Sequence, residues 1–292
     1  MSWKFWSRRR AELSEAERAA LKRLVGEARY ELIPLKTVGA ACDALPPDVA
    51  VTVTASPSHG IEATFELSER LAARGHDVTP HLSAHMIRDR AHLGELLARA
   101  RAAGIRRTFV VGGDSKEPGA FHDGLSLLRA LDECGHPFEE IGVPAYPEGH
   151  AEIADDALWR ALEDKQRFAQ AMTTQMCFNP KALAAWLAQA RARGVTLPLH
   201  LGVPGVAELT KLMAISARIG IADSARYLKK NRAMVGRVMR GGSFGPDAFL
   251  FALAPTLADP AADVRGLHVF TFNQVANTAD WQRRMLETEL GA

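Results

Sequence analysis

The sequence is short of the features that mark several common classes of protein. It has only 3 cysteines in 292 residues, Cys42, Cys134 and Cys177, and their spacing matches no zinc motif. An odd number leaves one thiol unpaired in any disulfide scheme, which favours a reducing compartment. No apolar run approaches the ~18 residues of a membrane-spanning helix, and the N-terminus lacks the apolar core of a secretory signal. We therefore expect a cytoplasmic protein that is not a membrane protein.

An excess of charge of one sign is also missing. Lys and Arg total 36 and Asp and Glu total 34, for a net charge of +2. We expect no nucleic-acid partner, because such partners require a basic surface. Basic clusters at residues 8–10 and 229–240 are interpreted as solvated helix faces. There is no P-loop, no G-x-S-x-G elbow and no C-x-x-C, so the chemistries tied to those motifs are not indicated.

What the sequence does contain is a regular alternation of apolar runs with amphipathic, Ala/Leu/Arg-rich stretches. Parallel strands buried on both faces are typically such continuous apolar runs. The alternation predicts a single (β/α)8 TIM barrel over residues 28–292, with an N-terminal helical extension over 1–27 and extra helices near 223–240 and 246–258. An open doubly wound sheet is the alternative, but no G-x-G-x-x-G follows the first strand. The strands are predicted near 29–35, 49–55, 77–83, 106–113, 139–146, 171–178, 197–204 and 266–273.

Polar residues stand at the C-terminal ends of several of these runs, where a barrel enzyme carries its active site. Glu31 is followed by Leu-Ile-Pro, and a carboxylate among apolar neighbours is costly to bury in its charged form. That favours the protonated form that a general acid needs. Pairing of Glu31 with Lys36 or Arg29 in solvent is the alternative.

Two other strand ends carry groups suited to binding a ligand. Asp114 follows Gly112 and Gly113, which let the backbone approach a ligand closely. A turn or N-cap role is the alternative for Asp114. Gln175 lies in an apolar run, and its amide offers a donor and an acceptor to a pterin or to the edge of a flavin. The alternative is an inward-facing amide satisfied by the protein itself.

Histidines stand near two of the strand ends. His81 and His85 have i, i+4 spacing, but His81 ends a strand and no third ligand is apparent, so we expect no metal site. The segment Tyr-Pro-Glu-Gly-His at 146–150 is dense in hydrogen-bonding groups, which favours binding of a cofactor.

Seven short motifs resemble, in order, those of the methylenetetrahydrofolate reductase family. The resemblance runs from about Tyr30 to Asn273 and covers most of the chain. It implies a (β/α)8 barrel that binds FAD at its C-terminal face and uses NADH or NADPH to interconvert 5,10-methylenetetrahydrofolate and 5-methyltetrahydrofolate. The motifs are Y-E-L-I-P at 30–34, V-T-V-T at 51–54, P-H-L-S at 80–83, G-G-D at 112–114, A-Y-P-E-G-H at 145–150, T-T-Q-M-C-F at 173–178 and F-T-F-N at 270–273.

The resemblance implies a role for each matched residue. Glu31 resembles the acid that protonates N10 and opens the imidazolidine ring of the folate. Asp114 resembles the carboxylate near the pterin and the flavin, and Gln175 resembles the amide that positions the folate. Flavin contacts are implied at matched positions, and Gly113 joins them because its backbone can approach a ligand. The matched positions are Thr54, His81, Asp114, Tyr146, His150 and Lys165.

The chain also departs from the family pattern. Gly112 stands where the family often has an Arg, and Leu158, Ala161 and Asp164 stand where it places Asp, Asn and Arg against the FAD. An acid in place of an Arg beside a pyrophosphate is unfavourable by charge. Leu209 stands where an aromatic side chain stacks on the benzoyl ring of the folate. FAD, another flavin and direct hydride transfer without flavin all remain open.

The sequence thus predicts a methylenetetrahydrofolate reductase-like oxidoreductase with tetrahydrofolate as substrate. The alternatives are a 5-methyltetrahydrofolate-oxidising demethylation enzyme, a flavin-independent variant, and a non-catalytic folate-binding or partner-regulating barrel. Retention of Glu31, Asp114 and Gln175 argues against the non-catalytic alternative. The sequence does not indicate the nicotinamide preference or the direction of the reaction, and it leaves a homo-oligomer open.

Overall fold

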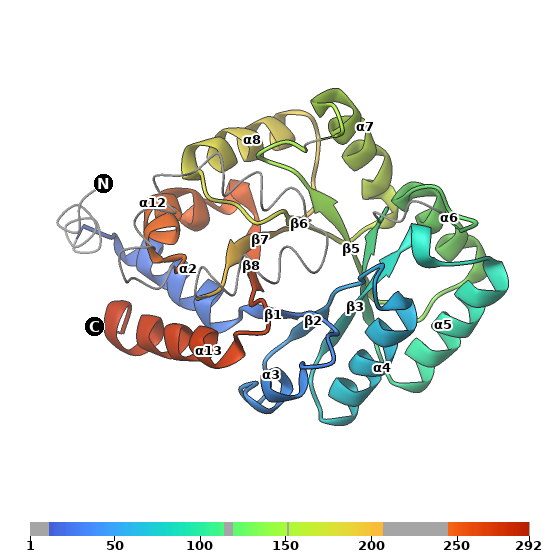
Figure 1. Ribbon diagram of the computed structural model, residues 1–292. Coiled ribbons are helices and arrows are strands. Elements are labelled where there is room, and N and C mark those ends of the chain that lie inside the picture. Colours follow the sequence, from blue (N-terminus) through green and yellow to red (C-terminus); the bar gives the residue numbers. More distant parts are fainter. Residues whose placement is uncertain (1–11, 114–118, 151, 207–244, 292) are drawn as a thin grey trace.

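The computed structural model describes residues 12–113, 119–150, 152–206 and 245–291 (Figure 1). Within these ranges, eight parallel strands pair in the order of the sequence, and β8 pairs with β1 to close the barrel. The predicted (β/α)8 barrel is therefore confirmed. The strands are β1 (Arg29–Leu32), β2 (Val51–Val53), β3 (Val78–Ser83), β4 (Arg107–Val111), β5 (Glu140–Ala145), β6 (Ala171–Thr174), β7 (Leu199–Pro204) and β8 (Val264–Phe270).

Helices surround the strands, as the ring of coiled ribbons in Figure 1 shows. The predicted helix near 246–258 is confirmed as α12, while the helix predicted near 223–240 lies outside the described residues. The short α3 was not predicted. The helices are α2 (Glu15–Gly26), α3 (Gly39–Asp43), α4 (Gly60–Ala73), α5 (Arg90–Ala102), α6 (Gly124–Cys134), α7 (Asp155–Lys165), α8 (Pro180–Ala192), α12 (Asp247–Ala258) and α13 (Val275–Arg284).

Several strands are shorter than the apolar runs that predicted them. The run at 171–178 contributes only Ala171–Thr174 to β6, because the chain then turns into a loop that leads to α8. The last strand begins earlier than predicted, at Val264, with a register shift against β7 at Leu199/His200. The apolar runs therefore include both the strand and the loop that follows it at the barrel mouth.

Local sequence signals account for the helix ends. Ser14 and Glu17 form a capping box at the start of α2. Asn179 caps α8, and Pro180 occupies the first turn of that helix, where its missing N–H costs nothing. Gly75 follows α4 with φ +92°, a conformation that glycine adopts without strain.

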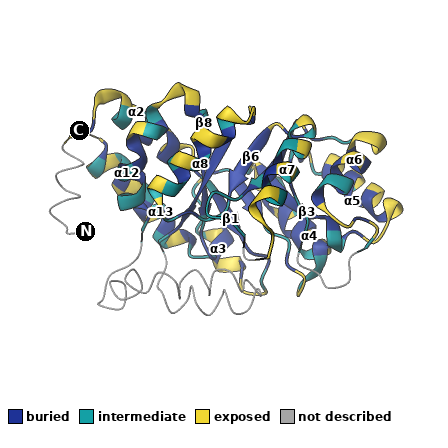
Figure 2. Ribbon diagram, turned by 90° about the horizontal axis from the view of Figure 1, so that it is seen from above, coloured by how far each residue is buried: buried dark blue, intermediate teal, exposed yellow. Residues whose placement is uncertain are grey.

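The core lies between the strands and the helices, and the strands are the buried centre of the molecule in Figure 2. Side chains alternate along β1. Tyr30 points outward and donates a hydrogen bond from its hydroxyl to Gln282 Oε1 on α13, at 2.7 Å. Arg29 and Glu31, at the intervening positions, point into the barrel, where Glu31 meets His268. This alternation places the functional side chains inside the barrel.

The N-terminal helix α2 shares the core of the barrel. Its Leu21, Leu24 and Val25 are buried in the same cluster as the strand residues. Arg23 donates to the backbone carbonyls of Val264 and Arg265, at 3.2 and 3.0 Å. These bonds attach α2 to the start of β8.

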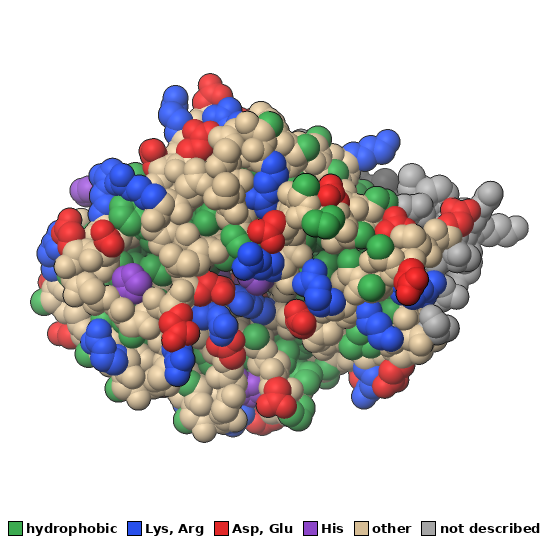
Figure 3. Space-filling view, turned by 180° about the vertical axis from the view of Figure 1, so that it is seen from behind, with side chains coloured by type: hydrophobic (Ala, Val, Ile, Leu, Met, Phe, Trp, Pro, Cys, Tyr) green, Lys and Arg blue, Asp and Glu red, His purple; other side chains and the backbone are tan. Residues whose placement is uncertain are grey.

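On the face seen in Figure 3, Lys and Arg side chains are interspersed with Asp and Glu side chains. This arrangement agrees with the nearly balanced charge of the sequence. In the described part of the chain, no helix is both long enough and apolar enough to cross a bilayer.

Candidate active site

Glu31 lies inside the barrel, near the C-terminal end of β1, and is 8% exposed. Its Oε2 is 3.0 Å from Nε2 of His268 on β8 and 4.0 Å from Nε2 of His81 on β3. The solvent pairing with Arg29 that the sequence left open is wrong, because Arg29 pairs with Glu140 at 2.9 Å. The structure thus brings a carboxyl group and two imidazoles together from three strands.

Aromatic rings surround this cluster. The ring of His81 lies 4.8 Å from that of Phe109, and the ring of His268 lies 4.6 Å from that of Phe270. Burial lowers the pKa of His81 to about 4, so its imidazole is neutral at pH 7. Its Nε2 is buried and has no hydrogen-bond partner among the described residues. Glu31 therefore faces one imidazole at hydrogen-bonding distance and one neutral imidazole slightly farther away.

The side chain of Gln175 is bonded to the loop that follows β5. Its Nε2 donates to the carbonyl of Gly149 at 3.1 Å, and its Oε1 lies 3.4 Å from the backbone N of Glu148. Glu148 Oε1 in turn accepts from the backbone N–H groups of Phe178 and Asn179, at 2.7 and 2.8 Å. These bonds correspond to the internally satisfied amide that the sequence left open. The folate contact of Gln175 stays a prediction.

The other predicted cofactor positions lie around the mouth of the barrel. Gly113 follows β4 with φ +99°, and a Cβ there would overlap Ser83 Oγ, so β3 and the end of β4 approach closely at this point. Thr54 follows β2, and its carbonyl accepts a hydrogen bond from Thr64. Lys165 ends α7, and burial lowers the pKa of its ammonium while the charge of Asp123 opposes that shift.

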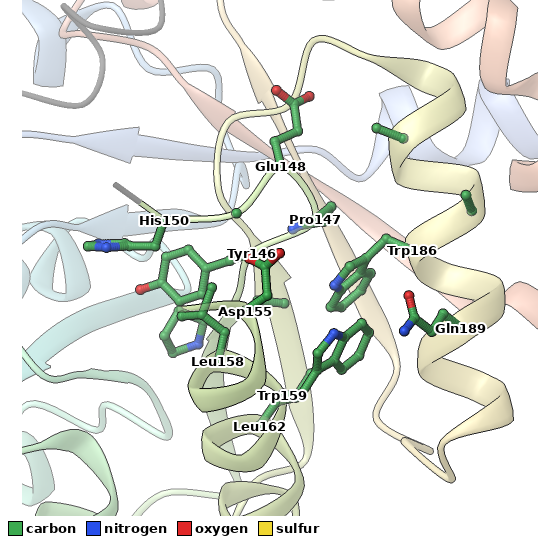
Figure 4. Close-up of a pocket in the computed structure, with 15 residues that line it drawn as sticks. Tyr146, Pro147, Glu148, His150, Asp155, Leu158, Trp159, Leu162, Trp186 and Gln189 are labelled. Carbon is green, nitrogen blue, oxygen red and sulfur yellow. The ribbon is translucent and has the colours of Figure 1, made fainter. Parts of the chain in front are cut away.

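Tyr146 and His150 occupy the loop after β5, with their rings edge to face at 5.3 Å (Figure 4). They stand beside the N-terminus of α7, which begins at this face of the barrel. These two rings offer flat contacts for the ring system of a flavin, and Lys165 offers a cation. The first turn of α7 carries Asp155 and Asp156, which would repel a pyrophosphate. The described residues therefore fit the ring end of a flavin better than its phosphates.

A cavity of about 580 Å³ lies beside this loop, between α7 and α8. Trp159 and Trp186 stack within it, with ring centroids 5.1 Å apart and planes at 14° (Figure 4). Leu158, a departure from the family pattern, also lines this cavity. Glu31 and His268 are not among its lining residues, so it is separate from the carboxyl–imidazole cluster.

Two predicted site residues, Asp114 and Leu209, lie outside the described residues. His268 was not among the residues predicted from the sequence. It stands within the predicted last strand, two residues before Phe270, and this spacing puts both side chains on the same face of β8. Among the described residues, no group of three or more His, Cys, Asp or Glu side chains is placed to hold a metal ion.

Fold and site together define a class: a closed (β/α)8 barrel whose polar groups gather near the C-terminal ends of its strands, where TIM-barrel enzymes carry their active sites. Comparison with known families narrows that class. The family model described as methylenetetrahydrofolate reductase matches residues 39–223, and the chain belongs to this family.

Solved structures were compared as well. The tryptophan synthase complex from Pyrococcus furiosus is similar at 13% identity and a TM-score of 0.48, over 91% of this chain and 98% of that chain. A Burkholderia cenocepacia J2315 protein described as a lyase/mutase is similar at 14% identity and a TM-score of 0.48, over 94% and 90%. Another from that organism, described as a phosphonomutase, is similar at 13% identity and a TM-score of 0.46, over 94% and 99%.

Proposed function

We propose that the protein is a cytoplasmic oxidoreductase that interconverts 5,10-methylenetetrahydrofolate and 5-methyltetrahydrofolate with NADH or NADPH. Membership of the methylenetetrahydrofolate reductase family supports the folate substrate. The single observation that carries the proposal is the buried carboxyl group of Glu31, held 3.0 Å from His268 inside the barrel.

Glu31 acts in this proposal as the acid that protonates N10 and opens the folate ring. N10 is an aryl amine and a weak base, so its protonation requires an acid placed out of bulk water. The burial of Glu31 between the rings of His81 and His268 meets that requirement. Asp114 and Gln175 are proposed to orient the pterin; for Gln175 this means exchanging its bond to Gly149 for one to the folate.

A flavin fits the proposal as the hydride carrier, with its ring end at Thr54, Gly113, Tyr146, His150 and Lys165. FAD, when bound there, would pass hydride from the nicotinamide to the folate. The acidic first turn of α7 and the apolar Leu158 favour weak retention of FAD, so direct hydride transfer remains the second candidate. The same site would serve 5-methyltetrahydrofolate oxidation, because a catalyst accelerates both directions.

The test is Glu31→Gln, which keeps the size of the side chain and removes the acid. We expect folate-dependent oxidation of NAD(P)H to fall by about 10²- to 10⁴-fold, the usual contribution of a general acid. Glu66→Gln, an exposed position on α4, is the matched control and should keep full turnover. Circular dichroism checks that both variants fold. Unchanged turnover in Glu31→Gln, or no folate turnover by the unaltered protein, would refute the proposal.

A further inference from the structure

A small cavity of about 10 Å³ lies inside the barrel, next to the contact between His268 and Glu31. Its lining includes His268, His200, Thr52 and Thr79. Thr52 Oγ1 and His200 Nδ1 are buried, and within the described part of the chain neither has a hydrogen-bond partner. A polar cavity of this size has room for about one water molecule, which needs partners of this kind. His268 therefore contacts Glu31 and also lines a polar cavity.

Charged groups close the floor of the barrel beneath this cavity. Arg29 lies 2.9 Å from Glu140, and Arg107 pairs with Asp77 and approaches Glu140 at 3.6 Å. The side chains of Arg29 and Glu140 are 17% and 27% exposed, so the floor reaches solvent. The charged groups nearest the cavity are therefore at the N-terminal end of the barrel, opposite to the mouth where the folate is proposed to bind.

Three imidazoles lie in this interior, and their surroundings differ. Burial lowers the pKa of His200 to about 3, with Arg29 as the next cause, and burial lowers the pKa of His81 to about 4. Both are neutral at pH 7, and His81 is 4.0 Å from the carboxyl group. His268 alone among the three is within hydrogen-bonding distance of Glu31. The titratable and charged groups that face the interior around His268 are Glu31 and Arg29 (β1), His81 (β3), Arg107 (β4), Glu140 (β5) and His200 (β7).

We propose that His268 reprotonates Glu31 from inside the barrel, on the side opposite to the substrate. This inference rests on the proposed function. Reduction of the methylene group consumes one hydride and one proton per turnover. Glu31 loses its proton to N10 and becomes a carboxylate, which then takes the proton on Nε2 of the His268 imidazolium. The neutral imidazole regains a proton from water in the cavity below. Oxidation of 5-methyltetrahydrofolate runs the same transfers in reverse.

His268→Gln tests this role, because a Gln amide can still donate a hydrogen bond to Glu31 but cannot carry a proton. Glu31 begins the first turnover already protonated, so rapid-mixing experiments should show a first turnover close to that of the unaltered protein. Later turnovers should slow by about 10-fold or more, giving a burst of one product equivalent. Added imidazole buffer should restore part of the steady-state rate. His76→Gln, on the loop before β3, is the control and should show no burst.

Other outcomes would overturn the proposal. Equal slowing of the first and later turnovers would mean that His268 only orients Glu31, and an unchanged rate would remove His268 from the reaction. A second readout needs no turnover: the ¹⁵N NMR titration of the His268 ring. In the unaltered protein the ring should report two coupled steps, because Glu31 and His268 share a proton, and in Glu31→Gln it should report a single step. A single step in both proteins contradicts the shared proton even if the protein proves to have no folate activity.

Discussion

Asn273 and Ile33 are joined by two hydrogen bonds across the closure of the barrel. Asn273 Oδ1 accepts from the backbone N–H of Ile33, and its Nδ2 donates to the Ile33 carbonyl, both at 2.9 Å. The hydroxyl of Thr271 also donates to the carbonyl of Glu31 at 2.5 Å. These bonds fix the end of β1 to the segment after β8, so the backbone that carries Glu31 is held by residues about 240 positions away.

Replacing Asn273 should destabilise the closed barrel. Asn273→Gly removes both hydrogen bonds, and we expect the free energy of unfolding to fall by about 1–3 kcal/mol. Asn273 has φ +58°, so Asn273→Ala should cost roughly 1 kcal/mol more than the Gly variant through backbone strain. Urea denaturation measures both. A Gly variant as stable as the unaltered protein would show that the two bonds contribute nothing.

Gly113 should not tolerate a side chain. Gly113→Ala places a Cβ onto Ser83 Oγ at φ +99°, and we expect a loss of about 1–3 kcal/mol. Combining it with Ser83→Gly relieves the overlap but keeps the backbone strain, so thermal denaturation of the pair separates the two causes. If Gly113→Ala alone leaves the melting temperature unchanged, the close approach of β3 and β4 at this point is wrong.

Lys165 should contribute to binding of a flavin. A hydrogen bond from a charged donor contributes about 1.5–3 kcal/mol to binding. Lys165→Gln should therefore weaken the binding of FAD about 10- to 100-fold. Quenching of FAD fluorescence on titration measures the Kd. Lys181→Gln, on the exposed start of α8, is the control. Equal affinity in the Lys165 and Lys181 variants would remove Lys165 from the flavin site, and no binding by the unaltered protein would favour direct hydride transfer.

Stability should fall in mild acid because two histidines are buried in their neutral form. The pKa of His81 is lowered to about 4 and that of His200 to about 3, while an unfolded chain binds these protons near pH 6.5. The contribution of these two neutral histidines to stability is therefore fully present above pH 6.5, and it is lost as the pH falls toward 4. Between pH 7 and pH 5, His81 should account for roughly 2 kcal/mol. Urea denaturation of His81→Gln should show that much less decline; an identical decline would contradict the assignment.

The sequence predicted the fold from local signals. Runs such as Val-Ala-Val-Thr-Val at 49–53 form buried parallel strands, and stretches such as 60–73 form amphipathic helices. These patterns depend on residues two to four positions apart, so they can be recognised without knowing how distant parts of the chain pack together. The position of Glu31 inside the barrel followed in the same way, from its place near the end of the first run.

The partners of those residues could not be predicted in this way. The sequence left two partners open for Gln175, a folate and the protein itself. The structure shows a bond to Gly149 in the loop after β5, and the folate contact stays a prediction. Several predicted strands also extended too far at their C-terminal ends, because apolar loop residues such as Cys177 are buried as deeply as strand residues. Burial alone does not tell a strand from a well-packed loop.

The sequence by itself determined the alternation of strands and helices and the strand ends at which the polar groups stand. The tertiary structure decided that Glu31 meets His268, a residue 237 positions away. That contact depends on the closure of β8 against β1 and on the stagger between those two strands. The stagger is set by the packing of all eight strands together, so no local pattern in the chain encodes it.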